Sequence, residues 1–425
     1  MKIKEYPSVG ERVHTERLDN GLSVYVIEKK GYNKAYALFA TKYGGADRRF
    51  KLGDKWYDTP AGIAHFLEHK MFDMSDGSNA LTTLYAKGAT ANAFTSSDMT
   101  AYLFESVDGF RDNLDTLLSF VSQPWFTDES VSKEQGIIGQ EIRMTEDNPG
   151  ICLYYGLLRS LFAHNPARDT VAGTVESIAE ISPETLYNCH KVFYNPSNMA
   201  LCVAGDVDPD MVCEAAREIL PKEPADVPVR AYGPDEGREP FERRFERCME
   251  VSAPVFYGGT KCVLPEDGTL ALRQELCGDL ALRLLMGRGS GLYSRLYSDG
   301  LIDYDFSAGY ESVAGVAYTL FGGESREPDK VCEEIKKEIL GISRSGFGKG
   351  FFERGKKAMY GMKLRELNSL DSICYSAARG HFGGYEPLRA FELLESISEE
   401  ETLDFIGENL VPDRIALSII RPVGQ

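Results

Sequence analysis

The chain has 425 residues, more than one hydrophobic core usually organises, so we expect two domains of about 200 residues each. Its formal net charge of −18 would repel nucleic-acid phosphates, which argues against a nucleic-acid partner and suits either simple solubility or the attraction of basic peptides. The N-terminus lacks an apolar signal core, and no stretch approaches about eighteen apolar residues, so we expect no membrane insertion and a cytoplasmic location.

The nine cysteines are an odd number and include no C-x-x-C pair. Neither a disulfide framework nor a thiolate metal site is therefore indicated. The simplest interpretation is that they are core residues in a reducing compartment.

Hydrophobic periodicity predicts strands and helices in separate blocks. We expect strands at 22–28 and 35–42 and helices at 110–123 and 328–343. This arrangement favours an α+β fold over a doubly wound parallel sheet.

The segment 65–69 reads H-x-x-E-H and is the main candidate for a metal site. On a helix, residues i and i+4 share a face, so His65 and His69 can bind one zinc ion while Glu68 lies beside them. Thr59 followed by Pro60 predicts a helix start just before this motif. The alternative is that the three side chains are ordinary histidines and a solvated carboxylate, so a third ligand is needed to decide.

A pair of carboxylates follows in the segment 132–144. Glu134 and Glu141 are seven residues apart, which places them on one helical face two turns apart. Taken alone, this spacing would most simply be a solvated acidic face. Together with the upstream motif, it is the expected second half of a zinc site.

A linker and an internal repeat indicate where the chain divides. Residues 223–237 are rich in Pro, Gly and charge, so we predict a first domain at 1–222 and a second at 238–425. The stretch 84–88 has an echo at 296–300, which indicates a duplication. The counterpart of the metal helix, 276–286, contains no His, so the second copy cannot hold zinc in the same way.

Five further segments can be compared with known families in addition to the two candidate metal-binding motifs. In chain order they are 62–72, 91–96, 173–178, 193–199 and 204–207. Together with H-x-x-E-H and Glu-x6-Glu, they resemble the pitrilysin/insulinase family of zinc metallopeptidases, the inverzincins. The resemblance is strong over 15–210 and weaker beyond, and the nearest branch is the bacterial, two-domain, processing-peptidase-like YmfH type.

The resemblance implies a fold, a cofactor and residue roles. The expected fold is α+β with two homologous domains, each a mainly antiparallel sheet covered by helices. One Zn²⁺ per chain would be bound by His65, His69 and Glu141, with Glu68 as general base. Glu134 would be a carboxylate that supports the ligands without binding the metal. Peptide hydrolysis is the activity that this set implies.

The segment 90–96 corresponds to the family strand that accepts a substrate backbone by strand addition. The resemblance therefore implies that Asn92, Ala93 and Phe94 contact the substrate. The expected substrate is an extended or unstructured peptide, whose identity and cleavage preference the sequence does not specify.

One family feature is missing from the second domain. Self-sufficient inverzincins usually carry an Arg seven residues before a Tyr, but no Arg lies seven residues before Tyr304. Arg288 or Arg295 could substitute, although oxyanion donors tolerate little displacement. We therefore predict a heterodimer whose homologous partner subunit supplies the Arg and Tyr. A homodimer and a non-catalytic scaffold subunit are the alternatives.

Overall fold

The computed structural model describes residues 1–424, which form two compact units. Unit 1 contains Met1–Ile142, Thr170–Tyr232 and Leu364–Pro387. Unit 2 contains Arg143–Asp169, Gly233–Lys363 and the C-terminal segment from Leu388.

These units differ from the continuous halves expected from sequence. Residues 143–169 from the first half belong to unit 2, and residues 364–387 from the second half belong to unit 1. Part of the expected linker also belongs to unit 1, because β10 (Val229–Arg230) pairs with β5 (Arg49–Leu52). Composition indicates where a chain is loop-like, but not which sheet an amphipathic helix will cover.

Unit 1 is built on a seven-stranded sheet in the order β1-β2-β3-β9-β4-β8-β7. Its neighbours are antiparallel except for the parallel pair β3 and β9. Every residue of the central strands β4 and β9 is buried, so both faces of the sheet are covered. The strands are β1 (Lys2–Tyr6), β2 (Glu11–Arg17), β3 (Ser23–Glu28), β4 (Ala35–Thr41), β7 (Thr90–Thr95), β8 (Thr100–Ser106) and β9 (Met199–Gly205).

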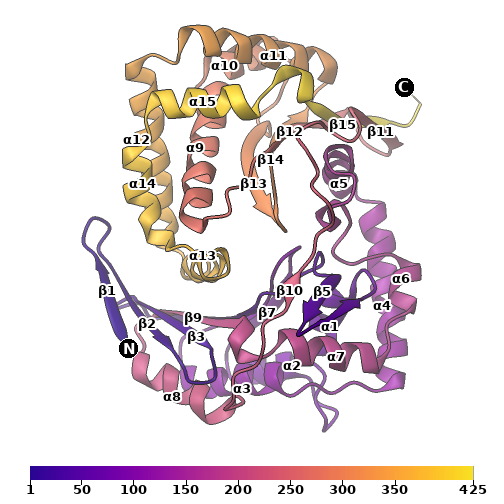
Figure 1. Ribbon diagram of the computed structural model, residues 1–425, viewed down its shortest axis with the longest axis vertical. Helices are drawn as coiled ribbons and strands as arrows, with labels where there is room; N and C mark the ends of the chain where they lie inside the picture. Colours follow the sequence, from indigo (N-terminus) through magenta and orange to yellow (C-terminus); the bar gives the residue numbers. More distant parts are fainter. Residues whose placement is uncertain (425) are drawn as a thin grey trace. The chain divides into compact units, whose positions relative to one another are not determined.

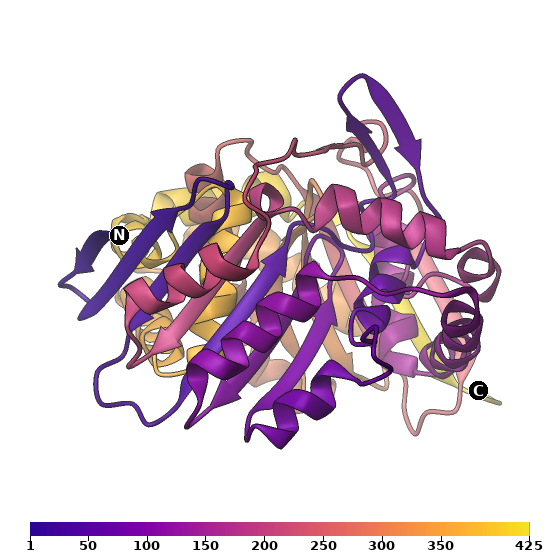
Figure 2. The same cartoon turned by 90° about the horizontal axis from the view of Figure 1, so that it is seen from below.

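Helices cover the two faces of this sheet. Helix α13 (Leu370–Gly383) packs on β9 and β4, while α3 (Phe110–Ser122) packs on β8 and β4 from the other side (Figure 1). Figure 2 shows α3 and α8 (Pro209–Ile219) covering one face of the sheet. The remaining elements are β6 (Lys55–Asp58), α1 (Ile63–Lys70), α2 (Ala80–Ala86), α4 (Asp128–Glu146, in unit 1 as far as Ile142), α6 (Val175–Ala179), α7 (Pro183–Phe193) and a 3-10 turn Pro196–Asn198.

Unit 2 contains a five-stranded sheet in the order β11-β15-β12-β14-β13, antiparallel except for β11 with β15. The strands are β11 (Arg244–Met249), β12 (Val255–Cys262), β13 (Ser307–Val313), β14 (Val316–Glu324) and β15 (Ala416–Pro422). The helices are α5 (Pro149–Leu161), α9 (Gly268–Met286), α10 (Gly291–Ser298), α11 (Pro328–Ser345), α12 (Lys349–Glu366, in unit 2 as far as Lys363), α14 (Ala390–Ser396) and α15 (Glu399–Asn409). Three 3-10 turns complete the described chain, at Pro166–Arg168, Pro387–Arg389 and Pro412–Arg414.

Both faces of this second sheet are covered as well. Tyr318 of β14 shares a hydrogen bond of 2.6 Å with Tyr154 of α5, whereas Tyr310 of β13 points to the other face, toward α9. Helix α5 lies close to β11 because a Cβ at Gly156 would meet the Phe245 ring at 2.4 Å. A larger residue at 156 would push the helix off the sheet.

The expected repeat is visible in two matching segments. In unit 1, α2 is followed by Gly88 at φ 77° and by the β7–β8 hairpin. In unit 2, α10 is followed by Gly300 at φ 66° and by the β13–β14 hairpin. The expected α+β fold with mainly antiparallel sheets is confirmed. Within the described residues, no helix is both long and apolar enough to cross a bilayer.

Candidate metal centre

Helix α1 carries the H-x-x-E-H motif. Its apolar side chains pack into the core, and a glycine at its N-cap allows close contact with a neighbouring chain segment. Ile63, Phe66 and Leu67 are buried in the core of unit 1. The expected start at Thr59–Pro60 is wrong, because the N-cap is Gly62, with φ 91° and no side-chain cap. A Cβ at Gly62 would lie 2.4 Å from the carbonyl oxygen of Ala172, so the close approach of this chain segment requires glycine.

The three expected ligands come together on the solvent side of this core. One oxygen of Glu141 on α4 lies 3.5 Å from Nε2 of His65, and the other lies 3.7 Å from Nε2 of His69. The two imidazole centroids are 4.5 Å apart. All three ligand atoms lie within 4.8 Å of one another, and no other such group occurs among residues 1–424.

This donor set fits zinc. Two ligand atoms bound at about 2.0–2.1 Å to a tetrahedral zinc ion lie roughly 3.4 Å apart, close to both Glu141 distances. Burial, with the neighbouring His69, lowers the pKa of His65 to about 4, which keeps its imidazole neutral and able to donate a lone pair. Two imidazoles and one carboxylate leave a fourth tetrahedral position for water or substrate.

Glu134 lies next to His69, on the side of the ring that faces away from Glu141. Its Oε1 is 3.1 Å from Nδ1 of His69, so a proton on Nδ1 would direct Nε2 toward Glu141. Burial opposes charge on both groups. The hydrogen bond between them nevertheless raises the pKa of His69, with help from the nearby carboxylates, and lowers the pKa of Glu134. Nδ1 of His65, by contrast, is buried with no hydrogen-bond partner among the described residues.

Glu68 is next to the ligands but is held by a different element. Thr95 of β7 donates a hydrogen bond of 2.8 Å to Oε2 of Glu68, and Thr100 lies 3.3 Å behind Thr95. Burial raises the pKa of Glu68, and the Thr95 hydrogen bond partly offsets that shift. A carboxylate with a raised pKa is suited to accept and return a proton.

The expected substrate strand β7 is an edge strand, because it is the last strand in the sheet order. The backbone N–H of Ala93, a residue in register with Tyr102 of β8, donates to the Asn92 side chain at 2.9 Å. Phe94 packs beside Tyr375 of α13, with ring centroids 5.9 Å apart. The outer edge of β7 therefore has no neighbouring strand within the part of the chain that the structure describes.

The two candidate arginines of unit 2 are engaged with other residues. Arg288 lies 3.6 Å from the centroid of the Tyr304 ring and donates to the Tyr304 carbonyl at 2.9 Å. Arg295 pairs with Glu338 of α11 at 2.6 Å. Neither arginine has the seven-residue spacing of the family pair.

Sequence reasoning missed two residues of the site, Thr95 and Lys70. Thr95 alternates with Phe94 along β7, so period-2 alternation places it on the opposite face, toward α1. Lys70 follows His69 directly, and its Nζ lies 3.8 Å from Glu134. No sequence signal distinguished it from a surface lysine.

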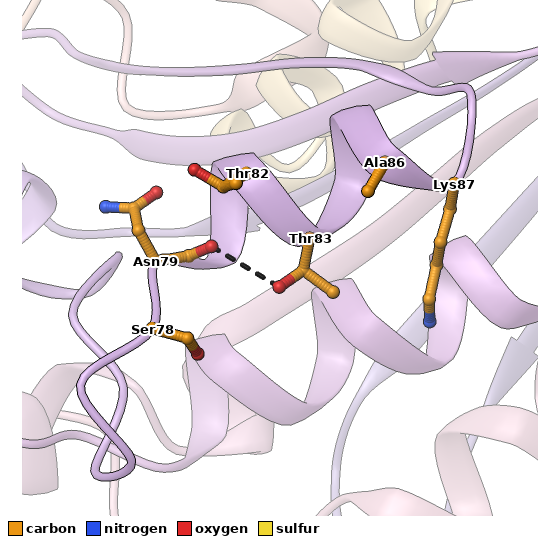
Figure 3. A pocket seen from close by; sticks show the side chains of 6 residues that line it. All are labelled: Ser78, Asn79, Thr82, Thr83, Ala86 and Lys87. Atoms are coloured by element: carbon orange, nitrogen blue, oxygen red, sulfur yellow. Dashed lines mark hydrogen bonds between the residues drawn. The ribbon is translucent and has the colours of Figure 1, made fainter.

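A separate depression of about 390 Å³ lies along α2 in unit 1 (Figure 3). Two of its lining side chains already have partners: Thr83 donates to the Asn79 carbonyl at 3.3 Å, and Lys87 donates to Thr116 at 2.8 Å. It contains no imidazole or carboxylate, so it is not part of the metal centre.

A helix with H-x-x-E-H, completed by a glutamate from a second helix on a two-unit α+β fold, defines the class of metallopeptidases with the inverted zinc motif. The family model for insulinase (peptidase family M16) matches residues 55–175, and the model for the peptidase M16 inactive domain matches residues 180–359. The chain belongs to the insulinase (M16) family.

Individual relatives agree with this family. The chain is 39% identical to the uncharacterized zinc protease YmfH of Bacillus subtilis, over 99% of each chain, which confirms the expected branch. The structure of a putative M16-like peptidase from Alicyclobacillus acidocaldarius is 33% identical, with a TM-score of 0.93 and 99% of each chain covered. The first half of the periplasmic protease PqqL from Escherichia coli shares the fold, with 18% identity, a TM-score of 0.74 and coverage of 96% of this chain and 92% of that one.

Proposed function

We propose that this chain is a zinc-dependent endopeptidase subunit that hydrolyses small or unstructured peptides. The observation that carries the proposal is the convergence of His65, His69 and Glu141 beside the carboxylate of Glu68. A chain with a purely structural role would have no need for three ligands and a buried base at one point.

One Zn²⁺ ion held by His65, His69 and Glu141 would lower the pKa of a water molecule and polarise the scissile carbonyl. Glu68 accepts the proton of the attacking water and passes it to the leaving amine. Thr95 keeps the Glu68 carboxylate in place through its 2.8 Å hydrogen bond, and Glu134 orients His69.

The substrate is an extended peptide that pairs with the edge strand β7. The Asn92 side chain is exposed and now accepts from the backbone N–H of Ala93, so a bound peptide would exchange with this hydrogen bond, and Phe94 offers an apolar contact. A peptide already folded into a domain could not present a free backbone edge to this strand.

We further propose that a homologous partner subunit supplies the Arg and Tyr that stabilise the oxyanion. The ion pair of Arg295 with Glu338 and the contact of Arg288 with Tyr304 support this proposal, because both arginines have other partners. Full peptidase activity of the purified chain, unchanged by a partner subunit, would contradict it. The nine free cysteines suit a cytoplasmic location.

The test of the leading proposal compares the zinc-loaded chain with Glu68→Gln on unstructured peptides, with and without the partner. Glu68→Gln should bind about one equivalent of zinc and lose hydrolysis. Equal hydrolysis by both proteins would reject Glu68 as the base.

The second candidate is a non-catalytic assembly subunit, which the match of residues 180–359 to an inactive-domain model favours. Metal analysis separates the two proposals. A chain that takes up no zinc even after supplementation would be a scaffold.

A further inference from the structure

Lys70, the last residue of α1, is a buried cation next to the metal centre. Its side chain is 2% exposed, although lysine is rarely buried without a partner. The ammonium donates to Asp73 and to the carbonyl oxygen of Ser130 at 3.3 Å, and lies 3.8 Å from Oε2 of Glu134. Three acceptors therefore compensate for the lost hydration of this charge.

The contact with Glu134 links Lys70 to the ligands. Glu134 uses its two oxygens differently: Oε1 faces Nδ1 of His69 and Oε2 faces Lys70. One carboxylate thus lies between a ligand imidazole and a buried ammonium, and its side chain is only 15% exposed. The ammonium favours the charged carboxylate in the orientation that also reaches His69.

Lys70 also connects the two helices that supply the ligands. Ser130 lies in the first turn of α4, one turn before Glu134, and Glu141 lies two turns after Glu134 on the same face. A buried ammonium at the end of α1 that donates to the Ser130 carbonyl and pairs with Glu134 restrains the rotation of α4 about its axis. That rotation decides whether Glu141 faces His65 and His69.

We propose that Lys70 is a positioning residue for the metal centre, whose ammonium holds Glu134 against His69 and thereby strengthens zinc binding. The inference rests on the proposed zinc site. Charge alone predicts the opposite sign, because a cation near the site repels Zn²⁺. Replacing Lys70 with a neutral side chain should therefore weaken zinc binding if positioning dominates, and strengthen it if repulsion dominates.

The test measures zinc affinity of the full chain, stripped of metal, by competition with a chromogenic chelator. Lys70→Met should weaken zinc binding about 10–100-fold, the usual effect of removing support behind a ligand. Lys70→Arg keeps the charge and should recover most of the affinity. Should Lys70→Met fail to fold, Lys70→Gln, which can still hydrogen-bond Ser130, should show a loss of about 10-fold.

A double-mutant cycle tests whether Lys70 affects zinc binding through Glu134. If Lys70 acts through Glu134, Lys70→Met should add less than about twofold to the loss caused by Glu134→Gln. If the fold-losses of zinc affinity in the two single variants simply multiply in the double variant, Lys70 does not act through Glu134. Unchanged or tighter zinc binding by Lys70→Met would overturn the proposal altogether.

Lys29 provides a matched control in the same unit. It is also a buried lysine, 8% exposed, and donates to Glu11 and to the carbonyl oxygen of Leu367, with no contact to a metal ligand. Lys29→Met should leave zinc affinity within about twofold of the unmodified chain. An equal loss in Lys29→Met would reduce the Lys70 effect to general destabilisation. A failure of the unmodified chain to bind zinc would instead reject the proposed function.

Discussion

Thr95 donates a hydrogen bond of 2.8 Å from its hydroxyl to Oε2 of Glu68, and so joins the edge strand β7 to the metal helix α1. The hydroxyl of Thr100, which bonds to the Tyr43 carbonyl at 2.8 Å, lies 3.3 Å from the Thr95 hydroxyl. The carboxylate that we propose as the base is therefore fixed relative to the strand that we propose for the peptide. A shift of one would displace the other.

Thr95→Val should lower kcat/KM about 10-fold, because it removes a hydrogen bond to a charged group worth about 1.5 kcal/mol while keeping the shape of the side chain. Zinc affinity should not change, because Thr95 touches no proposed ligand. Thr95→Ser keeps the hydroxyl and should retain most of the activity. Peptide hydrolysis and chelator competition measure the two effects, and a parallel loss of zinc binding would contradict the assigned role.

Zinc should stabilise the folded chain by mass action. At a free concentration of about 100 times Kd, the free energy of unfolding should rise by about 2.7 kcal/mol, provided that the unfolded chain binds no zinc. Glu141→Gln removes one charged ligand and should lose most of this increase. Thermal melts with zinc and with a chelator measure the effect, and an identical shift in Glu141→Gln would exclude Glu141 as a ligand.

Gly62→Ala should destabilise the chain by about 2–4 kcal/mol, because it combines a left-handed φ with a clash against the Ala172 carbonyl. Gly88 is the control, since it has φ 77° and nothing within 4 Å of an added Cβ. Gly88→Ala should cost only about 1 kcal/mol, the conformational part alone. Urea denaturation gives both values. Equal losses would mean that the close approach to Ala172 contributes nothing.

His190 should make the fold less stable in mild acid. Burial lowers its pKa to about 4, and its Nε2 lies 2.9 Å from the Val121 carbonyl. The unfolded chain, with a His pKa near 6.5, binds this proton more readily, so stability present above pH 6.5 is lost as the pH falls toward 4. Between pH 7 and pH 5 the loss due to His190 should be about 2 kcal/mol.

His190→Gln keeps a donor for Val121 but cannot titrate. The difference between the two proteins in the free energy of urea unfolding at pH 7 and pH 5 isolates this contribution. A pH dependence that is the same in both proteins would show that His190 does not supply it.

Much of the site could be predicted because its spacing is local. His65, Glu68 and His69 share one helix, and Glu134 and Glu141 share another, so helical periodicity places each set on a face. The family resemblance then paired the two helices. The α+β class and the strands around β3 and β4 also followed from alternation and turn residues.

The helix start at Gly62 could not be predicted from capping preferences, since it depends on the carbonyl of Ala172, more than a hundred residues away. The same holds for Thr95 and Lys70. Alternation along β7 gives the face on which Thr95 lies, but not its bond to Glu68, and nothing in the sequence around Lys70 shows that it faces Glu134.

By itself, then, the sequence determined the family, the α+β class and the residues that we propose as zinc ligands, because these depend on short-range spacing along single helices and strands. The tertiary structure decided which residues support the site, and it decided that residues 143–169 and 364–387 each belong to the unit built mainly from the other half of the chain. The physical reason is that a local pattern specifies which face of a helix will be buried. Which sheet or carboxylate that face meets is decided only when the whole chain packs.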